Sequence, residues 1–225
     1  MTKEHTREPQ YQPCLELRDR EGIPRLGLMS GQVWHEDPRR LAFVLSRYKF
    51  VAKMLSGRSH VLEVGCAHAF GARIVREETT RLTAVDFDSV FVHDAIERMD
   101  KHWHFVCMTH DILEGPVEGE FDGAYALDVL EHIPKQHEQR FVHNMVQSLV
   151  EHGVLVIGTP SLQSQAHASL GSKEGHVNCK NHHELQELLS GFFHNVFIFS
   201  MNDEVVHTGF YPMAHYLFAL CCSKC

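Results

Sequence analysis

The sequence predicts an α/β fold in which a doubly wound, mostly parallel sheet of seven strands carries helices on both faces. Short apolar runs rich in β-branched residues alternate along the chain with segments of helical periodicity, as in successive βαβ units. The run Val61–Val64 stops at a glycine turn, which is typical of a buried parallel strand. The run Leu82–Val85 is followed by Asp86, 21 residues after Gly65, about the spacing at which a βαβ unit brings a carboxylate to the hydroxyls of a ribose.

Two segments precede the first strand. Residues 1–37 are polar and interrupted by glycine and proline, so we expect a loop-rich N-terminal arm before a domain over 38–225. Asp37 and Pro38 then form a helix start, and apolar residues recur at helical spacing until Gly57. The buried stripe of this amphipathic helix consists of Leu41, Val44, Leu45, Tyr48, Val51, Ala52 and Leu55.

The turn after the first strand is the centre of the predicted site. The stretch Val61–Gly71 reads V-L-E-V-G-C-A-H-A-F-G and leads into a helix from about Ala72 to Glu78, whose first N–H groups are free to face a ligand. Small residues in the turn let the backbone come close to that ligand. These residues are Gly65, Cys66, Ala67 and Ala69. Together with Asp86, the turn predicts a nucleoside-binding half.

Departures from the dinucleotide pattern indicate which nucleoside it binds. The motif G-x-G-x-x-G needs glycine at 65, 67 and 70, whereas this chain has Ala67 and Phe70, which gives a pyrophosphate poor support. Glu63 adds negative charge beside the turn, which is unfavourable for a pyrophosphate and suits a ligand that carries an ammonium or sulfonium group. The pattern therefore favours S-adenosylmethionine (SAM).

The motifs in their order resemble those of the class I SAM-dependent methyltransferases. E-V-G-C-A-H-A, A-V-D, M-T-H-D-I, F-D-G-A-Y-A-L-D-V-L-E-H-I and G-V-L-V-I-G-T-P follow one another, and the likeness covers roughly Val61 to Leu220. The resemblance implies an antiparallel last strand and an arm that closes over the cofactor, with Arg47, Tyr48 and Lys49 within reach of the methionine carboxylate. It places Asp111 at the adenine amino group. The cofactor set that we predict comprises Glu63, Gly65, Cys66, Ala67, Asp86, Phe87, Asp111, Ile112, Leu127 and Asp128.

Phe87 has two interpretations, because it is placed either to cover a face of the adenine or to pack in the core. Ala67 and Ala69 replace glycines that are usual in the family's turn. Alanine fits there where φ is negative and is strained where φ is positive, which would reduce SAM affinity.

The remaining elements follow in alternation. We expect a helix from Asp88 or Ser89 to about Met99, strands at 104–108, 123–127 and 154–157, and between the last two strands a helix that begins near Pro134. A long polar segment then leads to a helix capped by Asn181, with Glu184 three residues on. Strands at 195–199 and 213–222 complete the sheet.

Ligands of open parallel sheets lie outside the carboxyl ends of the strands, so the segments that follow those strands share one rim. Four converge there, namely the Gly65 turn, residues 128–132, the loop 159–183 and the connection 201–212. A loop as long as 159–183 is typical of a substrate-binding segment.

Methyl transfer to a hydroxyl requires removal of the hydroxyl proton, and a neutral imidazole has a suitable pKa of about 6.5. His132 and His176 are the catalytic candidates, ahead of the other rim histidines His182, His183 and His207. Asp128 and Glu131 suit orientation of the cofactor or the substrate. These acids and the histidines of one rim can also hold a divalent ion, but the sequence shows no paired ligand spacing, and we predict no metal.

The amino-acid composition limits the kinds of partner and the cellular location that we expect. The 21 basic and 29 acidic residues give a net charge of −8 without basic runs, which argues against nucleic acid. No apolar run reaches the roughly 18 residues of a membrane span. Seven cysteines in no disulfide or zinc pattern, without a signal peptide, are typical of reduced thiols in the cytoplasm. The oligomeric state stays open.

We therefore expect a cytoplasmic methyltransferase that moves a methyl group from SAM to a small-molecule acceptor, with oxygen favoured over nitrogen. An inactive methyltransferase-like binding module is the first alternative, because of Ala67 and Ala69. A NAD-dependent Rossmann enzyme is the second, and it would need the missing glycines.

Overall fold

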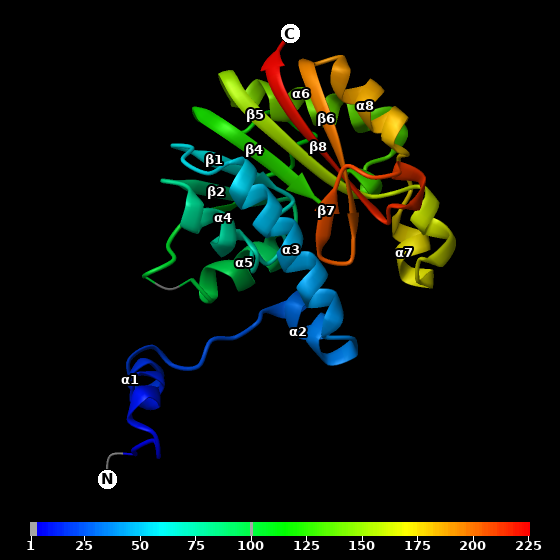
Figure 1. Cartoon of the computed structure of the whole chain (residues 1–225). Helices are drawn as coiled ribbons and strands as arrows, with labels where there is room; N and C mark the ends of the chain where they lie inside the picture. The colour runs from blue at the N-terminus through cyan, green and yellow to red at the C-terminus, as the bar shows by residue number, and fades with distance from the viewer. Residues whose placement is uncertain (1–3, 100) are drawn as a thin grey trace.

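A mixed sheet of eight strands runs through the computed structural model, which describes residues 4–99 and 101–225 (Figure 1). Its strand order is β3-β2-β1-β4-β5-β8-β6-β7. The strands β1 to β5 pair in parallel, whereas β8 pairs antiparallel with both β5 and β6. The bounds are β1 (Val61–Val64), β2 (Leu82–Asp86), β3 (Val106–Thr109), β4 (Phe121–Leu127), β5 (Leu149–Pro160), β6 (Phe193–Asn202), β7 (Val205–His207) and β8 (Tyr216–Lys224). The predicted fold class and the antiparallel last strand are confirmed.

Helices cover both faces of the sheet and divide the core into two clusters (Figure 1). On one face α3, α4 and α5 pack through residues such as Val51, Val75 and Ala95; on the other, α6 and α8 pack through Phe141 and Leu185. The strand β1 is buried at all four positions because it lies between these layers. The bounds are α1 (Gln12–Glu21), α2 (Leu28–Glu36), α3 (Arg39–Met54), α4 (Ala72–Glu78), α5 (Ser89–Glu97), α6 (Glu138–Ser148), α7 (Leu170–Gly175) and α8 (His182–Ser190).

The arm differs from the expected loop. Within 4–37, α1 and α2 are helical, and a 3-10 turn, η1 (Pro9–Tyr11), precedes them. Pro13 lies in the first turn of α1, where a missing N–H costs nothing, and Gly22 and Gly27 flank the helices with φ of 83° and 84°. Glycine and proline thus delimit two short helices here. The domain boundary at 37/38 stays a prediction.

The connection 201–212 also differs, because it holds the additional strand β7. Asn202 pairs with Val205 in a tight hairpin, and Asp203 takes the left-handed conformation with φ of 49° that the turn needs. Because aspartate tolerates this conformation, the turn needs no glycine, and the sequence gives little sign of the hairpin. The 3-10 turn η5 (Tyr211–Met213) completes the connection to β8.

The segment 159–183 is folded back on the domain. It contains η4 (Gln163–His167) and α7, and its two ends meet where Leu162 N–H donates to the Lys180 carbonyl at 2.8 Å. The buried Lys180 ammonium pairs with Glu138 at the start of α6. At the far end, the predicted capping box of Asn181 and Glu184 begins α8. These contacts fix the segment against the domain, and its middle faces the rim at the end of β4.

No helix within the described ranges is long and apolar enough to cross a membrane.

Candidate cofactor and acceptor site

Segments that follow β1, β2, β3 and β4 meet at one edge of the sheet. Backbone bonds hold them in register, since Gly65 and Cys66 donate to the Val85 carbonyl at 2.8 and 3.0 Å, and His110 donates to the Asp86 carbonyl at 2.9 Å. The Gly65 turn, Asp86 and the start of the Asp111 segment therefore share one rim. Asp128 follows β4 on that rim and donates through its N–H to Gly158 of β5 at 3.0 Å.

The turn after β1 combines close approach with backbone strain. Gly65 has φ of 74°, and a Cβ at this position would lie 2.3 Å from Cγ2 of Val129, so only glycine fits. Ala67 and Ala69 have φ of 45° and 49°. An alanine in this left-handed region costs roughly 1–2 kcal/mol. The turn therefore stores strain at the place where the sequence predicts the cofactor.

Replacing both alanines with glycine should relieve that strain. We expect the Ala67→Gly/Ala69→Gly double variant to gain about 1 kcal/mol in free energy of unfolding, because the strain removed exceeds the roughly 0.4–1 kcal/mol per site of added chain entropy. Urea denaturation measures the change. Ala95→Gly in α5 is the control and should lose stability. A double variant less stable than the parent would contradict the strained geometry.

Asp86 ties this turn to β2. Its buried carboxylate accepts the Ala67 N–H at 2.7 Å through one oxygen and the Asp88 N–H at 2.9 Å through the other. Each carboxylate oxygen has a second acceptor position, so both can still accept a hydroxyl. Asp86 therefore orients the turn and retains the capacity that a ribose requires.

Glu63 lies under α3. Its side chain is 1% exposed, its Oε1 accepts the Tyr48 hydroxyl at 2.9 Å, and its Oε2 is buried with no hydrogen-bond partner among the described residues. Burial raises the pKa of Glu63 to about 7. The hydrogen bond from Tyr48 was not expected from the sequence, which places Tyr48 in an amphipathic stripe and within reach of the methionine carboxylate; its hydroxyl donates to Glu63 instead.

Arg47 closes over the end of β4. Its Nη1 lies 2.7 Å from both carboxylate oxygens of Asp128, and its guanidinium carbon lies 3.9 Å from the centroid of the Tyr216 ring. Arg47 Nε is buried and has no hydrogen-bond partner in the part of the chain that the structure describes. Asp128 has φ of 57°, which turns the chain sharply out of the strand. A cation and an anion thus stand side by side at the rim, with one donor still unused.

The other predicted cofactor residues fall into two groups. Phe87 is 73% exposed, which excludes the core-packing interpretation and leaves its ring free at the rim. Asp111 accepts the Leu113 N–H at 2.8 Å and shapes the turn after β3. The second group is buried and consists of Cys66, Ile112 and Leu127.

The structure brings His132 and His176 together, although 44 residues separate them. Their rings lie 5.1 Å apart between centroids and meet edge to face. His132 Nδ1 donates to the Gly175 carbonyl at 2.9 Å, and the Glu131 carbonyl accepts the Val177 and Asn178 N–H groups. The three other rim histidines are not part of this contact, because His182 and His183 begin α8 and His207 bonds Asn202 in the β7 hairpin.

Glu131 is a buried carboxyl group beside these rings. Its side chain is fully buried in η2 (Leu130–His132), where Oε2 accepts the Thr159 hydroxyl at 3.1 Å and Oε1 has no partner in residues 4–99 and 101–225. Burial raises the pKa of Glu131 to about 8, and the negative charge of Asp128 acts in the same direction.

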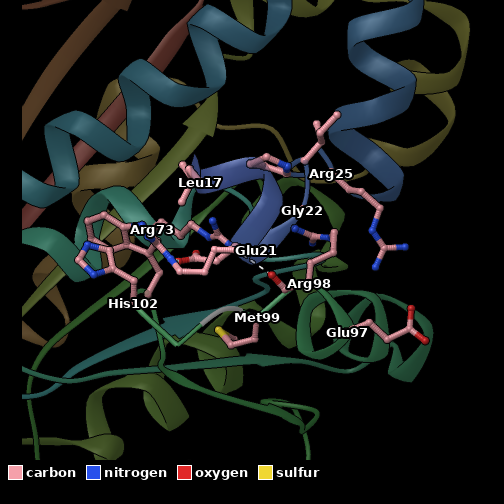
Figure 2. A pocket seen from close by; sticks show the side chains of 13 residues that line it. Leu17, Glu21, Gly22, Arg25, Arg73, Glu97, Arg98, Met99 and His102 are labelled. Atoms are coloured by element: carbon pink, nitrogen blue, oxygen red, sulfur yellow. Dashed lines mark hydrogen bonds and ion pairs between the residues drawn. The ribbon is translucent and has the colours of Figure 1, made fainter. Parts of the chain in front are cut away.

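The arm contacts the cofactor turn and encloses a separate cavity. Ser30 of α2 hydrogen-bonds the buried His68 ring at 2.7 Å, which fixes the arm beside the turn. A cavity of about 540 Å³ lies between the arm and the end of α5. Its lining side chains are drawn in Figure 2, and none of them belongs to the predicted cofactor set. Its lining includes Arg20, Arg25, Arg73, Arg98, His102 and Trp103.

The fold and the rim together define a class of protein. A doubly wound sheet whose first strand ends in a glycine turn and whose second ends in a carboxylate is the construction of Rossmann-like nucleoside-binding proteins. Residues 61–153 match the family model described as a methyltransferase domain. Comparison with curated protein sequences gives no match.

Solved structures share the fold across nearly the whole chain. N-methyltransferase NodS from Bradyrhizobium japonicum WM9, in complex with S-adenosyl-L-homocysteine, is 20% identical, with 92% of this chain and 97% of that chain covered and a TM-score of 0.62. The methyltransferase domain of bacterial CtHen1-C is 14% identical, with 81% and 100% covered and a TM-score of 0.66. The plantazolicin methyltransferase BpumL, in complex with SAH, is 13% identical, with 86% and 93% covered and a TM-score of 0.62. These structures show that the chain shares their fold, and the family match over residues 61–153 agrees with the resemblance to the class I SAM-dependent methyltransferases.

Proposed function

We propose that this protein transfers a methyl group from SAM to the hydroxyl of a small molecule. One observation carries the proposal. A cofactor turn tied to Asp86 and a pair of imidazoles, His132 and His176, follow parallel strands at the same edge of the sheet. A methyl donor and a proton acceptor are the two things that O-methylation requires at one place.

The residues of the rim suit SAM. Gly65 leaves room that any Cβ would fill, and Asp86 keeps two acceptor positions for ribose hydroxyls. Glu63 Oε2 is a buried acceptor that no described residue contacts by a hydrogen bond, and the ionised carboxylate adds negative potential for a positively charged ligand. Exposed Phe87 offers an aromatic face to the adenine. The remaining predicted cofactor residues keep the roles implied by the resemblance.

When bound, SAM supplies a methyl group on a sulfonium. His132 has its Nδ1 proton fixed on the Gly175 carbonyl, so its Nε2 carries the free lone pair. His176 is in the same state, because its Nδ1 is 2.8 Å from Oε1 of Gln165, an oxygen that can only accept. Either Nε2 can accept the proton of a hydroxyl at the rim.

The two imidazoles also favour an oxygen acceptor over a nitrogen acceptor. A neutral amine attacks with its own lone pair and needs no base beforehand, whereas a hydroxyl benefits from the two imidazoles. NodS is described as an N-methyltransferase, so nitrogen acceptors are the second candidate. The net charge of −8 favours small molecules over nucleic acid, and a cytoplasmic location stays a prediction.

The histidine pair gives the test of this function. His176→Ala should lower turnover on a hydroxylated acceptor by about 10²-fold, the lower end for general-base catalysis, and leave the SAM dissociation constant unchanged. His143→Ala, on the exposed face of α6, is the control. Production of S-adenosylhomocysteine is followed for each variant. Unchanged turnover would show that His176 is only a loop residue.

The two alternatives predict different results. A binding module without activity predicts no SAM binding, or binding without turnover on any acceptor pool. A NAD-dependent enzyme predicts binding of NAD in place of SAM.

A further inference from the structure

We infer that Glu131, His132 and His176 form a binding site for one divalent transition-metal ion. Each side chain offers one ligand atom, and the three atoms all lie within 4.8 Å of one another. Glu131 and His132 come from η2, directly after β4, and His176 comes from the segment that folds back over it. Two imidazoles and one carboxylate are a common ligand set of mononuclear metal sites.

Both imidazoles are prepared for a metal by their partners. A histidine that binds a metal usually donates its other ring N–H to a carbonyl or carboxylate, which fixes the tautomer and the ring. His132 donates to the Gly175 carbonyl at 2.9 Å, and His176 to Oε1 of Gln165 at 2.8 Å. These two contacts occupy Nδ1 of both rings, so Nε2 is the nitrogen that each neutral imidazole has left to offer a metal.

The buried carboxyl group of Glu131 gives a second, independent indication of a ligand. Its Oε2 accepts the Thr159 hydroxyl, whereas Oε1 is fully buried and has no partner within the described chain. Burying an acceptor without a partner is costly in free energy. A cation bound to Oε1 and to the two imidazoles removes this cost.

The site closes slightly on binding. Ligand atoms about 2.1 Å from an ion lie roughly 3.0–3.5 Å apart, so these side chains approach one another by on the order of 1 Å. His132 is exposed and His176 is half-buried, which leaves their rings room for this movement. The coordination positions of the ion that the three side chains do not fill are open toward the rim.

The open positions give the ion a role that rests on the proposed function. An acceptor hydroxyl bound there has a lowered pKa and releases its proton to solvent. The oxygen then bonds to the methyl carbon as the bond from that carbon to sulfur breaks, which gives a methyl ether and S-adenosylhomocysteine. In this form His132 and His176 act on the hydroxyl through the ion.

The sequence led to the opposite expectation, that of no metal. Glu131 and His132 are adjacent and His176 is distant, so no repeated ligand spacing is visible. Only the return of the segment 159–183 onto η2 assembles the three.

Titration of the metal-free, untagged protein with Co²⁺ tests the site. We expect one equivalent to bind with visible d–d absorption, and Zn²⁺ to displace it. His132→Ala and Glu131→Gln should each weaken Co²⁺ binding at least tenfold, and Gln165→Ala, which removes only the partner of His176, about tenfold. His143→Ala is the matched control, needed because the chain has 19 histidines, and should bind Co²⁺ like the parent.

Circular dichroism and SAM titration of the same samples separate the possible failures. Absence of the Co²⁺ spectrum, or equal Co²⁺ affinity in the parent, His132→Ala and folded Glu131→Gln, would overturn the metal site. If SAM still bound, the proposed function would stand with the imidazoles as direct bases. Loss of SAM binding with an intact Co²⁺ site would instead overturn the proposed function alone.

Discussion

Replacing Asp86 with alanine is expected to weaken SAM binding by about 2–3 kcal/mol, or roughly 30- to 150-fold in dissociation constant. Two effects add. The variant loses the charged acceptor for the ribose hydroxyls, and it releases the Ala67 N–H, which Asp86 holds at 2.7 Å. Because Ala67 is strained at φ of 45°, the turn relaxes once that bond is gone.

Calorimetric titration with SAM measures this loss. Asp86→Asn keeps one carbonyl acceptor and should fall between the parent and alanine. Asp122→Ala is a control at the opposite end of the sheet, where this carboxylate accepts the N–H groups of Ser59 and His60. An unchanged dissociation constant in Asp86→Ala would remove Asp86 from the cofactor site.

Glu63→Gln should stabilise the fold at high pH and weaken SAM binding at the same time. Burial raises the pKa of Glu63 from 4.5 to about 7, so the folded protein binds more protons there than the unfolded chain between these values. The stability that this group contributes is present below pH 4.5 and is lost as the pH rises to 7. The loss is about 3 kcal/mol.

Glutamine removes this pH dependence and keeps an oxygen for the Tyr48 hydroxyl. We expect Glu63→Gln to exceed the parent in free energy of unfolding by about 3 kcal/mol at pH 8, with the difference disappearing near pH 4.5. Urea denaturation across this pH range tests it. Tyr125 and Asp86 also face Glu63, but neither changes in the variant. A difference that does not depend on pH would exclude a raised pKa as its cause.

The same substitution removes a buried negative charge beside the cofactor turn. SAM affinity should therefore fall about tenfold in Glu63→Gln, the reverse of its effect on stability. Equal SAM affinity in the parent and the variant at pH 8 would show that the Glu63 carboxylate only supports the structure.

The cofactor half could be predicted because its signals are local. The strand, the turn, Asp86 and the helix after it lie within 61–78 and 82–86, and the order of these elements requires only short-range patterns. The sequence shows that Ala67 and Ala69 are strained only if their φ angles are positive. The sign of φ cannot be read from the sequence, because it depends on how the turn meets Val85 and Asp86.

The acceptor side depends on contacts that no local pattern encodes. Arg47 and Asp128 are 81 residues apart and meet because α3 crosses the end of β4. Tyr48 meets Glu63 for the same reason. The two catalytic candidates could be named individually as rim histidines. Their contact depends on where the segment 159–183 returns, which is decided by the bonds of Val177 and Asn178 to Glu131.

The most direct test of the cofactor assignment is calorimetric titration of the purified protein at pH 7.5 with SAM, S-adenosylhomocysteine and NAD in parallel. We predict that both adenosyl compounds bind with one site per chain and that NAD does not, because Ala67 and Phe70 stand where a pyrophosphate needs glycine. Absence of adenosyl binding would contradict the proposed function and favour a binding module whose turn is closed. Binding of NAD alone would place the protein among the dehydrogenases.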